Sequence, residues 1–574
     1  MLGNQAVARG AFEAGVRVVS SYPGTPSTEI TEYISKYDEV YAEWAPNEKV
    51  ALEVAIGAAI GGGRAMSCMK HVGLNVAADP LFTVSYTGVN GGLVICVADD
   101  PGMHSSQNEQ DSRHFAKASK TMMLAPADSA ECKAFVKQAF DLSEQFDTPV
   151  LIGLSTRVSH SQSLVVTEDR VEKELPPYEK NPGKYVMMPA MARGRHDAVE
   201  DRILKQKEFA ETTELNRTEY HSKKIGIITA GISYQYAKEA LGESASYLKL
   251  GVVYPLPEKR IRDFVASVDI CYVAEELDPI IEEHCKTLGL SVIGKEKFSL
   301  KGEYSAEMIR NVILNEKTAF VTRDEQIPGR PPVMCAGCPH RAVFTVLNRL
   351  KAVVSGDIGC YTLAALPPLN AIDACICMGA SVSMAHGMEK ARGRAFSKNT
   401  VAVIGDSTFM HSGITGLVDV VYNKGNSTVI ILDNSITGMT GHQDNPTTGK
   451  TIKGEPTKQV DLKKLCEAVG VDRVTVCDPF DADAFTEIVK REMAADEPSV
   501  IIAQRPCALL KSVNYTGKCV ILKEKCKKCN LCIKTGCPAI IKIDGDLTID
   551  PALCVGCAYC QRVCKFGAIE KGDH

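Results

Sequence analysis

The chain of 574 residues is 45% hydrophobic and 24% charged, and it carries a formal net charge of -5. This is the composition of a globular protein, and at ~150 residues per domain it predicts three to five domains. It argues against a nucleic-acid or anionic-membrane surface, which needs clustered Lys and Arg. No apolar run approaches the ~20 residues of a membrane span, and the start MLGNQAVARG lacks the signal-peptide pattern, so we expect a cytoplasmic protein.

The first part of the chain, residues 1–165, alternates helix-like and strand-like runs. Apolar, β-rich segments are followed by Gly, Pro or Asp turns at 17–24, 93–99 and 149–154. This pattern predicts a parallel α/β unit. Residues 166–222 are charged, broken by prolines and show little periodicity, so we interpret them as a linker or extended excursion.

Two further α/β units are predicted downstream, over residues 223–325 and 326–515, with a boundary within Arg323–Pro332. Strand-like runs lie at 225–231, 251–256, 270–276, 352–359, 400–406, 428–434 and 499–504. Their spacing is that of βα repeats, so we expect doubly wound parallel sheets. Residues 517–574 form a short Cys-rich tail of a different kind.

The tail holds eight of the 22 cysteines, in two groups with CxxCxxC spacing. The first group is Cys526, Cys529, Cys532 and Cys537, and the second is Cys554, Cys557, Cys560 and Cys564. Such paired groups suit two [4Fe–4S] clusters, in which the remote fourth Cys of each group binds the other cluster. Disulfide frameworks belong to small secreted domains, and structural zinc sites seldom repeat this spacing twice. Other cysteines lie inside apolar stretches, where a reduced Cys behaves as a small hydrophobe: Cys68, Cys96, Cys132 and Cys271.

Over residues 520–570 the tail resembles the bacterial-type two-cluster ferredoxin. The resemblance implies one cluster on Cys526, Cys529, Cys532 and Cys564, and another on Cys537, Cys554, Cys557 and Cys560. Two departures are an extra residue before Cys537 and Lys565 in place of the usual Pro.

A second motif is Gly405-Asp406-Ser407, followed after 25 residues by Asp433-Asn434. Each part ends a predicted strand, and ligands of α/β units bind beyond the carboxyl ends of the strands. One carboxylate, neutral oxygens and a diphosphate suit Mg²⁺, which rarely has an all-protein cage. The alternative is that these side chains cap helices.

This motif resembles the thiamine-diphosphate motif GDG…NN, with Ser407 in place of the last Gly and Asp433 in place of the first Asn. The resemblance implies that Asp406, Asn434 and the carbonyl of Ile436 hold Mg²⁺. It also implies that Met378, in Cys377–Ser381, wedges the cofactor into its bent form; the alternative is an ordinary core methionine.

Thiamine enzymes carry on a second domain a Glu that hydrogen-bonds the aminopyrimidine ring. Residues 44–58, WAPNEKVALEVAIGA, resemble that element. Glu48 is the predicted catalytic residue and Glu53 the second choice, whereas a plain helix-start Glu on the macrodipole is the alternative. The turn-rich segment 21–27 is expected to line the same cleft.

Over nearly its whole length the chain resembles the alpha subunits of indolepyruvate:ferredoxin oxidoreductases, a thiamine-diphosphate-dependent 2-oxoacid:ferredoxin oxidoreductase family. The supporting stretches are 22–29, 70–76, 103–113, 335–341, 356–363, 376–381 and 433–441. The resemblance implies a pyrimidine-binding domain (1–165), a transketolase-C-terminal-like domain (223–325), a diphosphate-binding domain (326–515) and a ferredoxin tail (517–574). It further implies oxidative decarboxylation of aryl pyruvates to acyl-CoA and CO₂, a smaller beta subunit, ferredoxin and coenzyme A.

Four more cysteines could form a third site. In related 2-oxoacid:ferredoxin oxidoreductases a proximal [4Fe–4S] cluster lies beside the thiamine, and this chain has matching residues in Cys335, Cys338, Cys360 and Cys507. An empty or structural CxxC pair is the alternative.

Two rival functions remain to be weighed. A non-oxidative thiamine decarboxylase has no use for a ferredoxin tail. An electron-transfer subunit with a decayed thiamine site has no use for Glu48, Asp406 and Asn434.

Overall fold

The computed structural model describes residues 1–316, 326, 329 and 331–572. The chain forms two compact units, Met1–Asp324 and Glu325–His574, and each is described by itself. Most of the predicted boundary Arg323–Pro332 lies outside the described residues. In the described part of the chain, no helix is both long and apolar enough to cross a membrane.

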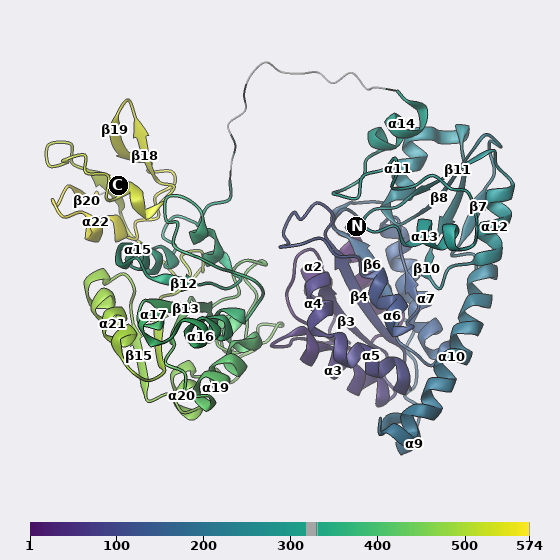
Figure 1. Cartoon of the computed structure of the whole chain (residues 1–574), viewed down its shortest axis with the longest axis horizontal. Helices are drawn as coiled ribbons and strands as arrows, with labels where there is room; N and C mark the ends of the chain where they lie inside the picture. Colours follow the sequence, from purple (N-terminus) through teal and green to yellow (C-terminus); the bar gives the residue numbers. More distant parts are fainter. Residues whose placement is uncertain (317–325, 327–328, 330, 573–574) are drawn as a thin grey trace. The chain divides into compact units, whose positions relative to one another are not determined.

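The first unit is built on a seven-stranded sheet with the order β10-β5-β6-β4-β3-β1-β2. Its strands β3, β4, β6 and β10 are labelled in Figure 1. Its strands are β1 (Val18–Ser21), β2 (Tyr41–Trp44), β3 (Ala65–Lys70), β4 (Leu93–Asp99), β5 (Met123–Leu124), β6 (Val150–Ser155) and β10 (Val252–Tyr254). All pair in parallel except β10 with β5. Strands β3 and β4 are buried along their whole length, as expected for the centre of a sheet covered on both faces.

Helices pack on this sheet through small and apolar side chains. They include α1 (Gly3–Glu13), α2 (Thr28–Ile34), α3 (Glu48–Ile60), α4 (His71–Val76), α5 (Ala78–Thr87), α6 (Arg113–Ser119), α7 (Ser129–Phe146) and α8 (Thr156–His160). Leu52 of α3 and Leu81 of α5 share a core with Ile95 and Val97 of β4. Cys68, Cys96, Cys132 and Cys271 are all buried and free, which confirms their interpretation as small core residues.

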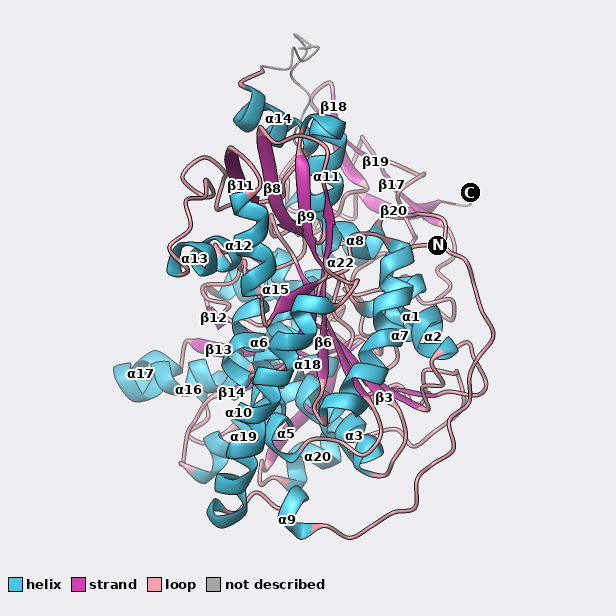
Figure 2. Cartoon of the chain, turned by 90° about the vertical axis from the view of Figure 1, so that its right-hand side faces the viewer, coloured by secondary structure: helices cyan, strands magenta, loops and turns pink. Residues whose placement is uncertain are grey.

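A four-stranded sheet follows in the same unit, in the order β11-β8-β9-β7. Its strands are β7 (Arg217–Glu219), β8 (Ile225–Ala230), β9 (Ser246–Leu250) and β11 (Ile270–Ala274). Figure 2 shows β11, β8 and β9 side by side, with α11 (Ile232–Leu241) close to them. Helices α12 (Glu258–Ala266), α13 (Ile280–Thr287) and α14 (Ala306–Leu314) complete this part. Strand β10, although it lies within the range 223–325, pairs with β5 of the first sheet instead.

The stretch 166–222, predicted as a linker, is only partly extended. It contains α9 (Pro182–Tyr185) and the 24-residue helix α10 (Pro189–Thr212). The buried residues of α10 are Val199, Arg202, Gln206 and Ala210, so half of its buried stripe is polar. A hydrophobic pattern therefore could not reveal it: Arg202 is buried because its guanidinium donates to the carbonyl oxygens of Ser85 and Asp147.

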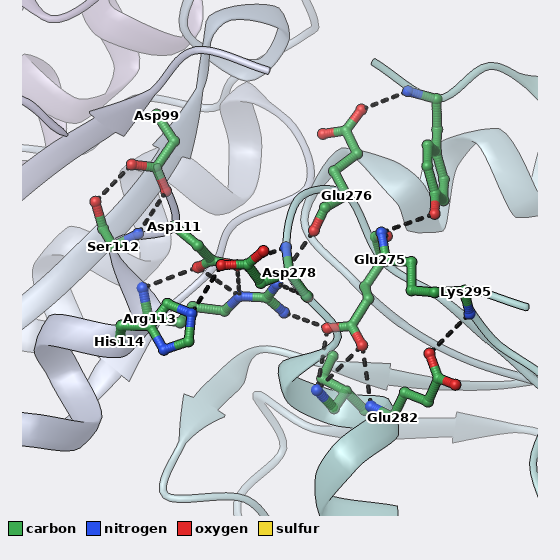
Figure 3. Close-up of polar contacts among 12 residues, drawn as sticks. Asp99, Asp111, Ser112, Arg113, His114, Glu275, Glu276, Asp278, Glu282 and Lys295 are labelled. Atoms are coloured by element: carbon green, nitrogen blue, oxygen red, sulfur yellow. Dashed lines mark hydrogen bonds and ion pairs between the residues drawn. The ribbon is translucent and has the colours of Figure 1, made fainter. Parts of the chain in front are cut away.

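A buried ion network joins the two sheets of the first unit (Figure 3). The Arg113 guanidinium pairs with Asp111 at 2.6 Å and with Glu275, which follows β11, at 2.5 Å. It also donates to the carbonyl oxygens of Glu276 and Asp278. Arg113, at the start of α6, thus links the loop after β11 of the four-stranded sheet to the seven-stranded sheet.

The second unit has a parallel sheet in the order β12-β13-β14-β16-β15. Its strands are β12 (Val353–Ser355), β13 (Thr400–Gly405), β14 (Thr428–Asp433), β15 (Arg473–Cys477) and β16 (Ser499–Gln504). The covering helices are α15 (His340–Leu350), α16 (Ala380–Arg392), α17 (Arg394–Ser397), α18 (Asp406–Thr408), α19 (Ile414–Tyr422), α20 (Leu462–Ala468) and α21 (Ala482–Ala494).

The Cys-rich tail forms two small antiparallel pairs in this second unit. They are β17 (Lys518–Ile521) with β20 (Ile569–Gly572), and β18 (Ile540–Ile543) with β19 (Asp546–Ile549); a short helix, α22 (Tyr559–Val563), precedes β20. Arg341 of α15 donates to the carbonyl oxygens of Cys335 (3.2 Å) and Thr535 (3.1 Å). One guanidinium therefore links the CxxC segment before α15 to the tail.

Candidate functional site

Glu48 begins helix α3, four residues after strand β2. The Asn47 side chain caps the helix by accepting from the backbone N–H of Val50 at 2.9 Å, and the Glu48 side chain is buried. A Cβ built on Gly73 would lie 2.6 Å from a Glu48 carboxylate oxygen, so the approach of α4 requires glycine at that position. Glu53, the second choice, is half exposed and pairs with Lys49 on the outer side of α3. This placement favours Glu48 over Glu53.

Strand β3 ends beside this helix and carries a residue that the sequence analysis missed. Lys70 is its last residue, and its ammonium is buried under the loop that holds Ser105. The only sequence signal was a basic residue at a strand end within the segment 70–76.

Asp406 and Asn434 emerge from neighbouring strands of the second unit. Strands β13 and β14 pair in parallel, with Gly405 opposite Leu432, and Asp406 and Asn434 follow their carboxyl ends directly. Both side chains are buried. Burial and the charge of Asp433 raise the pKa of Asp406 to about 8. Among the described residues no Lys or Arg pairs with Asp406, so a buried carboxylate at this position suits a divalent cation.

The loop after β14 contacts all three residues of this motif, Asp406, Ser407 and Asn434. The Thr447 hydroxyl donates to the Asp406 carboxylate at 3.4 Å, and the Thr437 hydroxyl donates to the Ser407 hydroxyl at 2.9 Å. Ile436, buried on the same loop, donates its N–H to the Asn434 side-chain oxygen at 3.3 Å. Carboxylate, hydroxyl and amide oxygens are ligands of the kind that Mg²⁺ prefers when it also binds phosphate. Thr437 and Thr447 were not predicted, because a loop that folds back leaves no periodic signal.

Met378 lies on the turn before α16 and is half-buried, outside the core clusters of this sheet. Asp357 fixes the turn by accepting from the N–H groups of Gly379 (2.8 Å) and Ser381 (2.9 Å). Gly379 has a φ of +85°, and a Cβ there would lie 2.7 Å from Ser412. The turn is thus held rigidly, with glycine required at its apex.

The four cysteines of the predicted third site lie around the same sheet edge. Cys507 donates its N–H to the carbonyl oxygen of Asn434 at 2.9 Å. Burial and the neighbouring thiols Cys507 and Cys335 raise the pKa of Cys360 to about 11. Burial and charge on Cys360 and Cys335 likewise raise the pKa of Cys338 to about 12. The influence of these thiols on one another agrees with a location in the same region of the second unit, and a shared cluster stays a prediction.

Several cysteines of the tail line one cavity. All four predicted ligands of the second cluster line it, together with Cys519 and Cys338: Cys537, Cys554, Cys557 and Cys560. Cys532 and Cys564 lie in the adjoining core, while Cys526 is half-buried and Cys529 exposed. Among the described residues, no three His, Cys, Asp or Glu side chains converge as they would on a single ion. In a four-iron cluster each thiolate binds a different iron, so the ligands lie farther apart.

Comparisons with known proteins match three parts of the chain. Residues 9–225 match the family described as pyruvate flavodoxin/ferredoxin oxidoreductase, thiamine diP-binding. Residues 357–503 match the C-terminal TPP-binding domain of thiamine pyrophosphate enzymes, and residues 547–570 match the 4Fe-4S binding domain.

Several relatives that match over the whole length are named indolepyruvate oxidoreductase subunit IorA. The protein of Archaeoglobus fulgidus is 41% identical and covers 99% of this chain and 97% of its own length. That of Pyrococcus horikoshii is 38% identical over 100% and 96%, and that of Methanothermobacter marburgensis 38% over 99% and 97%. The similarity therefore spans both units and the tail.

Proposed function

Since this chain belongs to the IorA family of thiamine-diphosphate-dependent 2-oxoacid:ferredoxin oxidoreductases, we propose that it catalyses the oxidative decarboxylation of aryl 2-oxoacids to acyl-CoA and CO₂. Thiamine diphosphate and iron–sulfur chemistry follow from the family matches. The aryl preference rests on the name of the relatives, indolepyruvate oxidoreductase. A smaller beta subunit, coenzyme A, ferredoxin and a cytoplasmic location complete the proposal.

The proposal is supported by an observation made in each unit separately: each carries buried residues that match one part of the thiamine-diphosphate pattern. Buried Glu48 stands on the sheet edge of the first unit. Asp406 and Asn434 follow adjacent strands in the second. When bound, thiamine diphosphate supplies the carbanion chemistry that decarboxylation needs. In our assignment Glu48 holds a proton at the aminopyrimidine ring, Asp406, Asn434 and the carbonyl of Ile436 hold Mg²⁺ on the diphosphate, Ser407 lines that site, and Met378 supports the bent cofactor.

The electron acceptors are proposed from the cysteines. One [4Fe–4S] cluster takes Cys526, Cys529, Cys532 and Cys564, and another takes Cys537, Cys554, Cys557 and Cys560. A third, on Cys335, Cys338, Cys360 and Cys507, is supported by the hydrogen bond from the Cys507 N–H to the carbonyl oxygen of Asn434 and by the influence of Cys507 and Cys335 on the pKa of Cys360. Anaerobically purified protein should then contain about twelve irons per chain, and Cys335→Ser/Cys338→Ser about eight. About eight irons in both proteins would exclude the third cluster.

The activity is tested on the complex with its beta subunit. Ferredoxin reduction, dependent on coenzyme A, is measured with indolepyruvate, phenylpyruvate, pyruvate and 2-oxoglutarate in parallel, and the two aryl substrates should give the highest kcat/KM. Glu48→Gln should abolish turnover while thiamine diphosphate still binds. Glu53→Gln, on the exposed side of the same helix, is the matched control and should remain active. Absence of turnover with all four substrates would instead favour an electron-transfer subunit with an inactive thiamine site.

A further inference from the structure

Lys70 places a nearly enclosed cation on the same sheet edge as Glu48. The Lys70 residue is 8% exposed. Its methylene groups pack against the turn at Gly24, where an added Cβ would lie 3.5 Å from the Lys70 Cβ. The ammonium donates to the carbonyl oxygen of Ser105 at 2.8 Å. An ammonium has three donors, and in the described part of the chain no carboxylate lies within ion-pair distance of this one.

The nearest acid is committed to other partners. The Asp100 carboxylate accepts from the N–H of Ser105 at 2.8 Å and from the hydroxyls of Ser106 and Thr156 at 2.6 Å each. The Ser105 hydroxyl in turn donates to the carbonyl oxygen of Thr25 at 3.2 Å. Asp100 therefore fixes the loop over Lys70 and the adjoining turn, instead of neutralising the lysine.

This arrangement leaves Lys70 suited to an anion. Burial lowers the pKa of Lys70 to about 8, while the charges of Asp100 and Glu48 act against that fall, so the side chain is still mostly protonated at neutral pH. A buried cation is stabilised when an anion replaces the lost water.

We propose that Lys70 binds the carboxylate of the 2-oxoacid substrate and so directs its 2-oxo carbon towards the edge where Glu48 lies. The inference rests on the proposed function, because it assumes that a 2-oxoacid reacts with thiamine diphosphate near Glu48. Lys70 would then select 2-oxoacids over neutral carbonyl compounds.

The test compares the best 2-oxoacid of the parallel assay with the aldehyde that has the same side chain but no carboxylate. In the complete complex, Lys70→Met should lower kcat/KM for the 2-oxoacid about 10- to 100-fold, mainly through KM, because a charge-assisted hydrogen bond is lost. The aldehyde, which uses the same coenzyme A and ferredoxin, should change less than about threefold. Lys70→Arg, which keeps the cation, should recover part of the loss.

Lys133→Met is the matched control, since Lys133 is also buried and its partner Glu13 keeps Arg9 at 2.9 Å and Lys137 at 3.3 Å. Lys133→Met should change kcat/KM for the 2-oxoacid and for the aldehyde by the same factor. An equal loss for acid and aldehyde in Lys70→Met, or no loss for either, would overturn the inference while leaving the proposed function standing. A wild-type complex that oxidises no 2-oxoacid would overturn the function itself.

A second measurement needs no variant and no turnover. Acetylation of Lys70 by an amine-reactive reagent, followed by mass spectrometry of the unmutated protein loaded with thiamine diphosphate, should slow several-fold when phenylacetate is added. Phenylacetamide, which has the same shape without the charge, should leave the rate unchanged. Equal rates with and without phenylacetate would count against a carboxylate at Lys70, even where Lys70→Met fails to fold.

Discussion

Replacing Arg113 with Met should destabilise the first unit by about 3 kcal/mol. Removal of one partner of a buried ion pair typically costs 3–5 kcal/mol, because a charge is left behind without compensation. Here the lower end applies, since both carboxylates keep backbone donors. Glu275 still accepts from the N–H groups of Ile281 and Glu282, and Asp111 still accepts from that of Asp278 at 3.2 Å.

The chain's single tryptophan provides the assay. Trp44 ends strand β2 of the first unit, so its fluorescence follows the unfolding of that unit in urea. With an m-value of about 3 kcal/mol/M, a loss of about 3 kcal/mol moves the midpoint down by about 1 M. Arg157→Met is the control: Arg157 pairs with Glu303 at 2.7 Å but is half exposed, so less than about 1 kcal/mol should be lost. Equal midpoints for the two variants would refute the reasoning.

Three further outcomes are expected. Burial and the charge of Asp111 raise the pKa of Asp99 to about 8, well above its unfolded value, so the native state binds the extra proton. The free energy of unfolding of the first unit should therefore fall as the pH rises from about 5 to 8. In urea titrations, Asp99→Asn should make this pH dependence weaker. An unchanged pH dependence in Asp99→Asn would mean that other groups cause it. Asp406→Ala should lose Mg²⁺ and thiamine diphosphate together, as measured by calorimetry. The control Asp419→Ala changes an exposed residue of α19 and should bind both. Stoichiometric cofactor bound to Asp406→Ala would rule out the metal site. Cys554→Ser should lose about four irons per chain without loss of thiamine binding, and unchanged iron would remove Cys554 from the ligand set.

The sequence predicted those features that leave a local signature. Asp406 and Asn434 could be paired from sequence because strand ends and a parallel order are visible in the apolar runs. Glu48 was chosen because residues 44–58 resemble an element of thiamine enzymes; the structure places it at a helix start, and its catalytic role stays a prediction. The CxxC spacings of the tail are visible in the same way.

Features that depend on long-range packing were not predicted from the sequence. Helix α10 was missed because its buried face includes Arg202 and Gln206, which are accommodated by partners far away in the chain. Strand β10 was assigned to the wrong sheet, since a run of apolar residues does not specify its neighbour. Lys70 and Thr447 act through loops whose folding no periodicity reveals.

The guanidinium of Arg341 has a kinetic consequence. Because it hydrogen-bonds both the Cys335 segment and the tail at Thr535, the two groups of cysteines are held at a fixed separation. The contact of Tyr559 with Phe480, at 4.9 Å between ring centres, supports the same attachment. Electrons entering the tail would then cross by tunnelling through packed protein, with no swinging carrier. That step should be indifferent to solvent viscosity, and only the later encounter with ferredoxin should slow in glycerol.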